Sequence, residues 1–388
     1  MMGHVLDRRK AWRLAVCALA TATLAACQLA LPSGPAPRVN GGTVNVGLLL
    51  PFGSAQGGDA LIARSIENAA RLAASEITAT SVNISVYPTA GNSAQAASMV
   101  DQAIREGADI IVGPLRSDAG AAVGVAAAPR GVSVLSFSNN TEIAGDNVFV
   151  LGNTFGNTAD RLVRYAAAQN RRRILVLHAQ NLAGEVARDA ILTAAQRNGS
   201  AVVTSVSYEF SANGVVQAIP QVMDAVENQA IDTVFITSDT TGALPLFAQL
   251  LPENGLDTEA VRLVGMTRWD TPPQTLELAG LEGGWFALPD PAASAAFSAR
   301  YQAAYQEPPH VLAGLGYDAI RLIAEASVST GRLGPADLSA ASGFNGANGV
   351  FRLNSDGTNS RGLAVASIVE SQVSIVDPAP TGSAGPGL

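Results

Sequence analysis

The sequence predicts an α/β protein whose chain folds into two doubly wound, parallel-sheet lobes. Apolar runs such as residues 44–50 are nearly continuous, as strands buried on both faces require. These runs alternate with helical stretches, and the alternation restarts near residue 156. Between two ends rich in proline and glycine lie about 335 residues, more than one hydrophobic core usually serves.

Each element follows from its own pattern. Apolar side chains that recur on one face, from Leu61 through Ile66 to Ile77, indicate a helix. The first half continues with strands at 82–86, 109–112 and 132–136 and helices near 94–105 and 119–128. The second half repeats the order with helices near 157–168, 184–197, 215–227 and 244–250 and strands at 174–177, 202–206, 233–236 and 261–264. Short crossovers of one hand would build each lobe.

The C-terminal part departs from this alternation. Helical stretches at 292–304 and 312–327 come first, and strands follow at 350–353, 363–368 and 373–376. Residues 354–357, Asn-Ser-Asp-Gly, are a turn signal between two of these strands. We expect a structural sheet edge here, with a ligand-contacting hairpin as the alternative.

Residues 1–26 have the parts of an export signal peptide. Basic residues from Arg8 to Arg13 precede an apolar run at 14–24, which is shorter than the roughly 20 residues of a membrane-spanning helix. The sequence LAAC at 24–27 then resembles the lipobox of bacterial lipoproteins. This resemblance implies cleavage before Cys27, lipidation of its thiol and attachment to a membrane through the lipid. An ordinary secreted protein is the alternative.

The expected anchor limits where the body of the protein acts. Gln28 follows the cysteine, and resemblance to the sorting rule of enterobacterial lipoproteins favours a periplasmic location at the outer membrane. Residues 27–42 are the expected lipidated cysteine and flexible tether, which reaches about 50 Å when fully extended. Residues 378–388 are an expected disordered tail. Retention in the inner membrane would favour a transport function instead.

Composition excludes several classes of function. The formal net charge is −8, although the signal peptide is positive, so we expect no nucleic acid partner. Lys10 is the only lysine, and Cys17 and Cys27 are the only cysteines, which excludes Schiff-base chemistry, disulfides and thiolate metal sites from the mature chain. His178 and His310 lie far apart and without a catalytic motif. We therefore expect no enzyme activity, no cofactor and no metal.

Small polar residues follow several of the predicted strands. Ligands of open α/β sheets bind beyond the carboxyl ends of the strands, where loop amides and helix N-termini point outward. Residues 52–54, 113–117 and 136–140 fall there, and so does the region of Trp269. Their glycines, hydroxyls and amides suit a zwitterion or a sugar-like group. Helix capping is the alternative for each residue alone.

The order of short motifs gives a more specific hypothesis. VGLLLP at 46–51, GPLRS at 113–117 and VLSFS at 134–138 are followed by YDA at 317–319 and GANGVF at 346–351. This series resembles type 1 periplasmic solute-binding proteins, whose best-known members bind leucine, isoleucine and valine. The resemblance implies two lobes joined by three crossing strands. The first lobe would be residues 43–155 plus 289–340, and the second would be residues 156–288 plus 341–377.

The same resemblance implies ligand-binding residues in the first lobe. Ser117, Ser138 and Asn140 match the family positions that hold the carboxylate and amine of an amino-acid ligand. Ser54 follows the first strand at the same edge of the predicted sheet. We expect these four residues to line a ligand-binding site.

The second lobe departs from the family pattern. Ala183 stands where an aromatic clamp is usual, and Thr267 stands where a carboxylate commonly meets the ligand amine. A buried ammonium without a carboxylate partner is costly. Asp239 or Asp270 could substitute, but an amino-acid ligand is less well supported than the fold.

A second resemblance lies within the same superfamily. RWD at 268–270, GGWF at 283–286, PDP at 289–291, RGLAV at 361–365 and VDPAP at 376–380 resemble the penicillin-binding-protein activator lipoproteins. The resemblance implies an outer-membrane lipoprotein that stimulates a peptidoglycan synthase through protein contact. The chain departs from well-known activators, because its first sheet starts directly after the tether and no helical-repeat domain precedes it.

Two hypotheses of function follow. The first is a cell-wall regulator, favoured because the second-lobe anchors for an amino acid are missing, with Trp269 and Trp285 as ligand or partner contacts. Packing inside the second lobe is the alternative for both tryptophans. The second hypothesis is the substrate-binding lipoprotein of an ABC importer, which closes over an amino acid or a similar small polar solute and docks on a permease.

Overall fold

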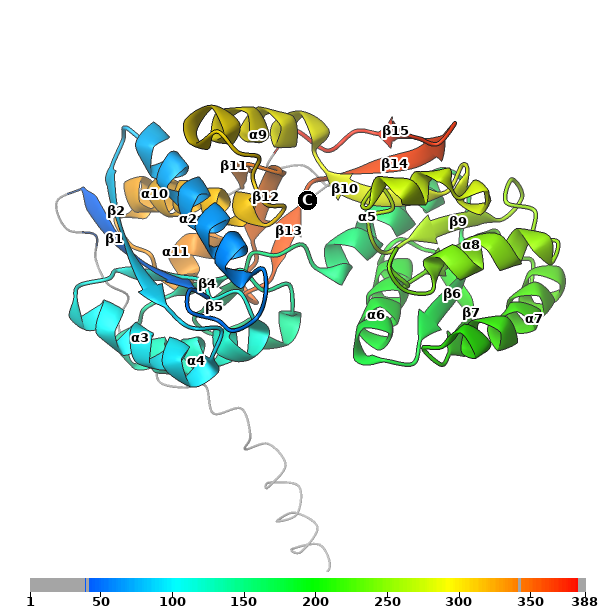
Figure 1. Cartoon of the computed structure of the whole chain (residues 1–388), viewed down its shortest axis with the longest axis horizontal. Coiled ribbons are helices and arrows are strands. Elements are labelled where there is room, and N and C mark those ends of the chain that lie inside the picture. The colour runs from blue at the N-terminus through cyan, green and yellow to red at the C-terminus, as the bar shows by residue number, and fades with distance from the viewer. Residues whose placement is uncertain (1–38, 40–41, 341–342, 383–388) are drawn as a thin grey trace, which may run out of the picture.

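The computed structural model describes residue 39 and residues 42–340 and 343–382. The expected signal peptide, Cys27, most of the tether and the end of the tail lie outside the described residues. The chain forms two lobes side by side, with the blue and cyan N-terminal elements in one and the green elements in the other (Figure 1). No helix in the described ranges is both long enough and apolar enough to cross a membrane.

The first lobe is built around a five-stranded parallel sheet of order β2-β1-β3-β4-β5. Alternate side chains of its strands enter two cores, so that Leu48 packs on one face and Leu49 on the other. Helices α2 and α10 cover the Leu48 face, and α3 and α4 cover the Leu49 face. The elements are β1 (Thr43–Leu50), α2 (Asp59–Glu76), β2 (Ser81–Pro88), α3 (Ser93–Arg105), β3 (Ile110–Val112), α4 (Ser117–Ala127), β4 (Val134–Ser136) and β5 (Val148–Val150).

The second lobe has a seven-stranded sheet of order β15-β14-β10-β9-β8-β6-β7. Strands β6 to β10 are parallel, and β14 joins β10 in the antiparallel direction. Helices α5 and α6 cover one face, and α7 and α8 cover the other. The elements are α5 (Phe155–Ala168), β6 (Arg173–Ala179), α6 (Leu182–Arg197), β7 (Ala201–Tyr208), α7 (Ala212–Asn228), β8 (Thr233–Ile236), α8 (Leu244–Glu253), β9 (Arg262–Gly265), β10 (Trp285–Pro289), β14 (Leu363–Val369) and β15 (Gln372–Asp377).

The predicted fold class, two α/β lobes with parallel sheets, is confirmed, but one expected boundary is wrong. Residues 341–377 were expected in the second lobe, whereas Phe344, Phe351 and Leu353 pack in the core of the first lobe. The chain returns to the second lobe only at β14. The intervening elements are α9 (Pro291–Tyr305), α10 (Ala313–Thr330), α11 (Pro335–Ser339), β11 (Phe344–Gly346), β12 (Gly349–Leu353) and β13 (Asn359–Arg361).

Side chains of β13 form hydrogen bonds with residues 150–152, where the chain first leaves the first lobe. Asn359 donates from Nδ2 to the carbonyl oxygens of Val150 and Gly152, at 2.8 and 2.9 Å. Arg361 donates to the carbonyl of Leu151 and forms an ion pair with Asp318 of α10, at 3.0 Å. These bonds join two of the segments through which the chain passes from the first lobe to the second, and we call residues 150–152 and 359–361 the hinge.

Candidate ligand-binding site

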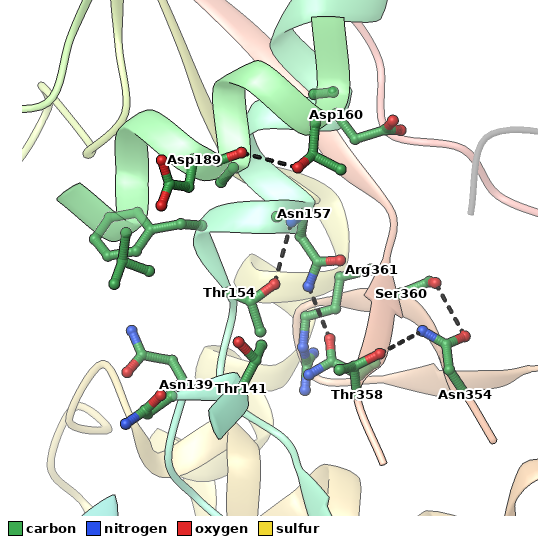
Figure 2. A pocket seen from close by; sticks show the side chains of 18 of the residues that line it. Asn139, Thr141, Thr154, Asn157, Asp160, Asp189, Asn354, Thr358, Ser360 and Arg361 are labelled. Atoms are coloured by element: carbon green, nitrogen blue, oxygen red, sulfur yellow. Dashed lines mark hydrogen bonds between the residues drawn. The ribbon is translucent and has the colours of Figure 1, made fainter. Parts of the chain in front are cut away.

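A pocket of about 840 Å³ lies between the two lobes, beside the hinge. We call it the interlobe pocket. Its lining comes from four places: the loop after β4, the start of α5, the length of α6 and the turn between β12 and β13. Figure 2 shows Asn139 and Thr141 on one side, Asp160 and Asp189 on the opposite side and Thr358 beside the hinge. Both lobes thus contribute to one site.

The wall from the first lobe is the loop after β4. The Ser138 hydroxyl, only 6% exposed, accepts from the backbone N–H of Asn140 at 3.0 Å. Asn140 in turn accepts from the N–H of Glu142 through its Oδ1 at 3.0 Å. Asn139 and Thr141, on either side of Asn140, are exposed and line the pocket (Figure 2). Asn140 lines the pocket as expected, whereas Ser138 does not line it and holds the loop.

The floor of the interlobe pocket is the hinge. Thr154 caps α5 by accepting from the N–H of Asn157 at 3.1 Å, which satisfies one of the free amides of the first turn. Asn157 then donates from Nδ2 to Oδ1 of Asn359 at 2.9 Å (Figure 2). Asn359 and Arg361 also line the pocket. A ligand here would therefore touch the residues that join the lobes.

The wall from the second lobe is the outer face of α6. Asn181 caps this helix by accepting from the N–H of Gly184 at 2.8 Å. A side chain at Gly184 would meet the carbonyl oxygen of Ala179 at 2.2 Å, so the glycine permits strand and helix to approach. Leu182 and Val186, which stand on either side of Gly184 in the helix, are 72% and 38% exposed and line the pocket. This wall is apolar at the start of α6, close to the carboxyl end of β6.

Two other expected residues of the first lobe, Ser54 and Ser117, do not line the interlobe pocket. They lie at the same edge of the sheet, next to the loops before α2 and α4, which an unexpected ion pair joins. Arg116 donates to both carboxylate oxygens of the buried Asp59, at 3.0 and 2.9 Å, and to Gln56 at 2.5 Å. The guanidinium thus bridges the loops before α2 and α4. The charged residue among small ones in GPLRS was the available signal.

The expected substitute carboxylates of the second lobe are engaged elsewhere. Asp239 accepts from the N–H and the hydroxyl of Thr241, at 3.1 and 3.0 Å, and so closes its own turn. Asp270 accepts two hydrogen bonds from Arg268, at 2.9 and 2.5 Å, and this partner raises the pKa of the Arg268 guanidinium. Neither carboxylate lines the interlobe pocket. The pocket therefore gives no support to the expectation that one of them meets a ligand amine, which stays a prediction.

Both tryptophans of interest are packed inside the second lobe. Trp269 is 0% exposed, and its ring centroid lies 5.9 Å from that of Phe286. Trp285 of β10 is 8% exposed and makes an edge contact of 4.8 Å with Tyr165. The expectation that they contact a ligand or partner is therefore wrong, and the alternative of core packing is correct. An aromatic after a strand end is compatible with either role, so sequence alone did not decide.

His178 is the buried titratable residue nearest the start of α6. Its Nδ1 lies 3.6 Å from Glu185, and burial lowers the pKa of the imidazole, which keeps it neutral at pH 7. Neither His178 nor His310 lines the interlobe pocket. In the described ranges, no group of three or more His, Cys, Asp or Glu side chains could hold a metal ion. That the chain is not an enzyme stays a prediction.

Fold and pocket together define a two-lobed α/β binding protein. The family of periplasmic binding proteins matches residues 43–372, and the chain belongs to this family. The predicted resemblance to type 1 periplasmic solute-binding proteins is thereby confirmed.

Solved structures share this fold at low sequence identity. A candidate branched-chain amino acid ABC transporter protein from Rhodospirillum rubrum is 19% identical, with a TM-score of 0.72 over 86% of this chain and 100% of that one. A branched-chain amino acid ABC transporter periplasmic ligand-binding protein from Burkholderia xenovorans is 17% identical, with a TM-score of 0.69 over 88% and 97%. A leucine-binding protein from Thermotoga maritima is 17% identical, with a TM-score of 0.55 over 86% and 97%.

One curated relative also matches. It is an uncharacterized protein of Rickettsia prowazekii, 22% identical over 232 residues. The match covers 58% of this chain and 61% of that relative.

Proposed function

We propose that this protein is a solute-binding protein that takes a small polar ligand into the interlobe pocket. The observation that carries the proposal is the make-up of the pocket: the two lobes form its walls and the hinge forms its floor. A ligand that contacts both walls would favour an arrangement in which the two lobes close over it, because it makes more contacts in that arrangement. The structural relatives that are named as ABC transporter proteins support an ABC permease as the partner.

Solute binding is better supported than regulation of a peptidoglycan synthase. The residues that suggested an activator lipoprotein have architectural roles, which explains their pattern without a protein partner. Trp269 and Trp285 are core residues, and Arg361 is held in a buried ion pair. Asp290 caps α9 by accepting from the N–H groups of Ala292 and Ala293. Activation of a synthase is retained only as the alternative outcome of the partner experiment below.

The first prediction is that a lysine at Val186 abolishes ligand binding. The longer, charged side chain would replace the apolar surface that the bound ligand contacts, and its ammonium would have to lose water of hydration against the ligand. Thermal shift with a panel of amino acids, sugars and aromatic acids should identify a ligand, since about 100-fold excess over Kd adds about 2.7 kcal/mol of stability. Val216→Lys is the matched control, because Val216 is 56% exposed on α7 and outside the pocket. Equal binding by both variants would contradict the proposed site.

We also propose that Cys27 carries a lipid and that the anchored protein meets an ABC permease. The second prediction is that Cys27→Ser moves the protein from the membrane fraction to the soluble periplasmic fraction. Cross-linking in cells should recover permease subunits with the unchanged protein and far fewer with the variant. A membrane-bound variant would refute lipidation at Cys27. Repeated recovery of a peptidoglycan synthase in place of a permease would restore the activator hypothesis.

A further inference from the structure

We propose that the interlobe pocket takes a neutral polyhydroxylated ligand, such as a sugar or an N-acetylated amino sugar. The ligand would present its hydroxyl edge to Asn139, Thr141 and Asn157 and its C–H face to Leu182 and Val186. This proposal rests on the proposed function and names the ligand class of the same pocket.

The two walls of the pocket differ in polarity. Within the described part of the chain, the side chains of Asn139 and Thr141 make no hydrogen bond, although both line the pocket. Asn157 uses its Nδ2 on Asn359 and keeps its carbonyl oxygen for another donor. An amide both donates and accepts, as a hydroxyl does. The first-lobe wall and the floor therefore offer neutral, two-way hydrogen bonding.

The opposite wall is apolar at the start of α6. Leu182 and Val186 lie one turn apart and are 72% and 38% exposed, and Phe155 lines the pocket beside them. If the lobes closed directly, unpaired amides would be buried against these aliphatic side chains, at a cost of about 1–3 kcal/mol for each unsatisfied polar group. A ligand with a polar edge and an apolar face removes this mismatch. A pyranose ring has both.

The charges of the pocket are mostly paired within the protein. Arg164 pairs with Asp160 and Asp189 with Arg188. Arg361 pairs with Asp318, and Arg352 has interactions of its own. Each of these arginines thus already has a partner within the protein before a ligand binds.

The charges without such pairs do not favour an anionic ligand. Glu142 lies in the amide-rich loop itself and would repel a carboxylate there. Arg197 lies at the other end of α6, about 22 Å along the helix axis from Leu182 at 1.5 Å per residue. An acidic or aromatic-acid ligand would have to bridge that distance to pair with Arg197 while it contacts Leu182. A neutral ligand needs no such contact.

Isothermal titration of the whole protein tests the proposal. The probes are pentoses, hexoses and N-acetylated hexosamines, with leucine, glutamate and benzoate for comparison. At least one sugar should bind, and Asn139→Ala and Leu182→Ala should each weaken that binding about tenfold. Asn228→Ala and Leu246→Ala are the matched controls, because these exposed residues lie on α7 and α8 outside the pocket, and they should change the affinity less than twofold.

The outcomes separate this proposal from the proposed function. Binding of leucine, glutamate or benzoate that Leu182→Ala weakens would overturn the sugar proposal and leave solute binding intact. Sugar binding that neither pocket variant changes would overturn the assignment of the walls. A protein that binds none of the probes at millimolar concentration would overturn the sugar proposal and the proposed function together.

Discussion

Replacing Arg361 with methionine is expected to lower the free energy of unfolding at pH 7.5 by about 3–5 kcal/mol. The variant would leave the carboxylate of Asp318 without its cation, while that carboxylate is 0% exposed in α10. It would also remove the hydrogen bonds of 3.1 and 2.6 Å to the carbonyl of Leu151 and the contact of 4.8 Å over the Phe351 ring. An uncompensated buried charge dominates the loss.

The pH dependence distinguishes this mechanism from loss of packing. Burial raises the pKa of Asp318, so the ionised form costs stability: the cost is absent below the unfolded-state pKa of about 3.9 and grows as pH rises through the folded-state pKa. Removing Arg361 removes a charge that opposes this shift. The deficit of Arg361→Met relative to the wild type should therefore be smaller at pH 5 than at pH 7.5, because proton uptake by Asp318 neutralises the unpaired charge.

Urea denaturation at the two pH values measures both effects. Arg300→Met is the control, since Arg300 is 45% exposed in its pair with Glu76 and an exposed pair contributes about 0–1 kcal/mol. The double variant Asp318→Leu, Arg361→Met should be more stable than Arg361→Met alone, because no buried charge remains. An equal deficit at both pH values, with no recovery in the double variant, would show that lost packing rather than an unpaired charge accounts for the loss of stability.

The fold could be predicted because its signals are local and repeated. Continuous apolar runs such as β1 and the alternation of strands and helices follow from burial on both faces, and each run gave a strand in the structure. The path of residues 344–353 could not be predicted in the same way. Phe344 and Phe351 would suit the core of either lobe, and only the three-dimensional arrangement around α10 decides which one they enter.

The site could be predicted only in part, for a physical reason. The sequence shows which residues follow a strand, but not whether their polar atoms are already used. Ser138 and Asp239 follow strands as expected, and one oxygen of each accepts a hydrogen bond within its own turn. Asn157 faces the pocket because Thr154 and Asn359 position it, and Asn359 is more than 200 positions away in the chain. No local pattern carries that contact.

Replacing Trp269 with alanine is expected to destabilise the second lobe by about 3–5 kcal/mol. The indole is fully enclosed: a side chain at Gly265 or Gly284 would come within 2.2 or 2.6 Å of it, so both glycines are needed to seat the ring. Removing the ring leaves a cavity that β9 and β10 cannot close, since both are central strands of the sheet.

Trp269→Phe separates the packing role from a polar one. The indole Nε1 is buried and has no hydrogen-bond partner among the described residues, so phenylalanine loses volume but no hydrogen bond. This variant should therefore cost clearly less than Trp269→Ala in urea denaturation. Ligand affinity, measured for either variant while it is folded, should stay within about twofold of the wild type, because the ring lies outside the interlobe pocket. Native stability combined with lost binding would instead place Trp269 in contact with the ligand, and would require a conformation in which the loop after β9 opens.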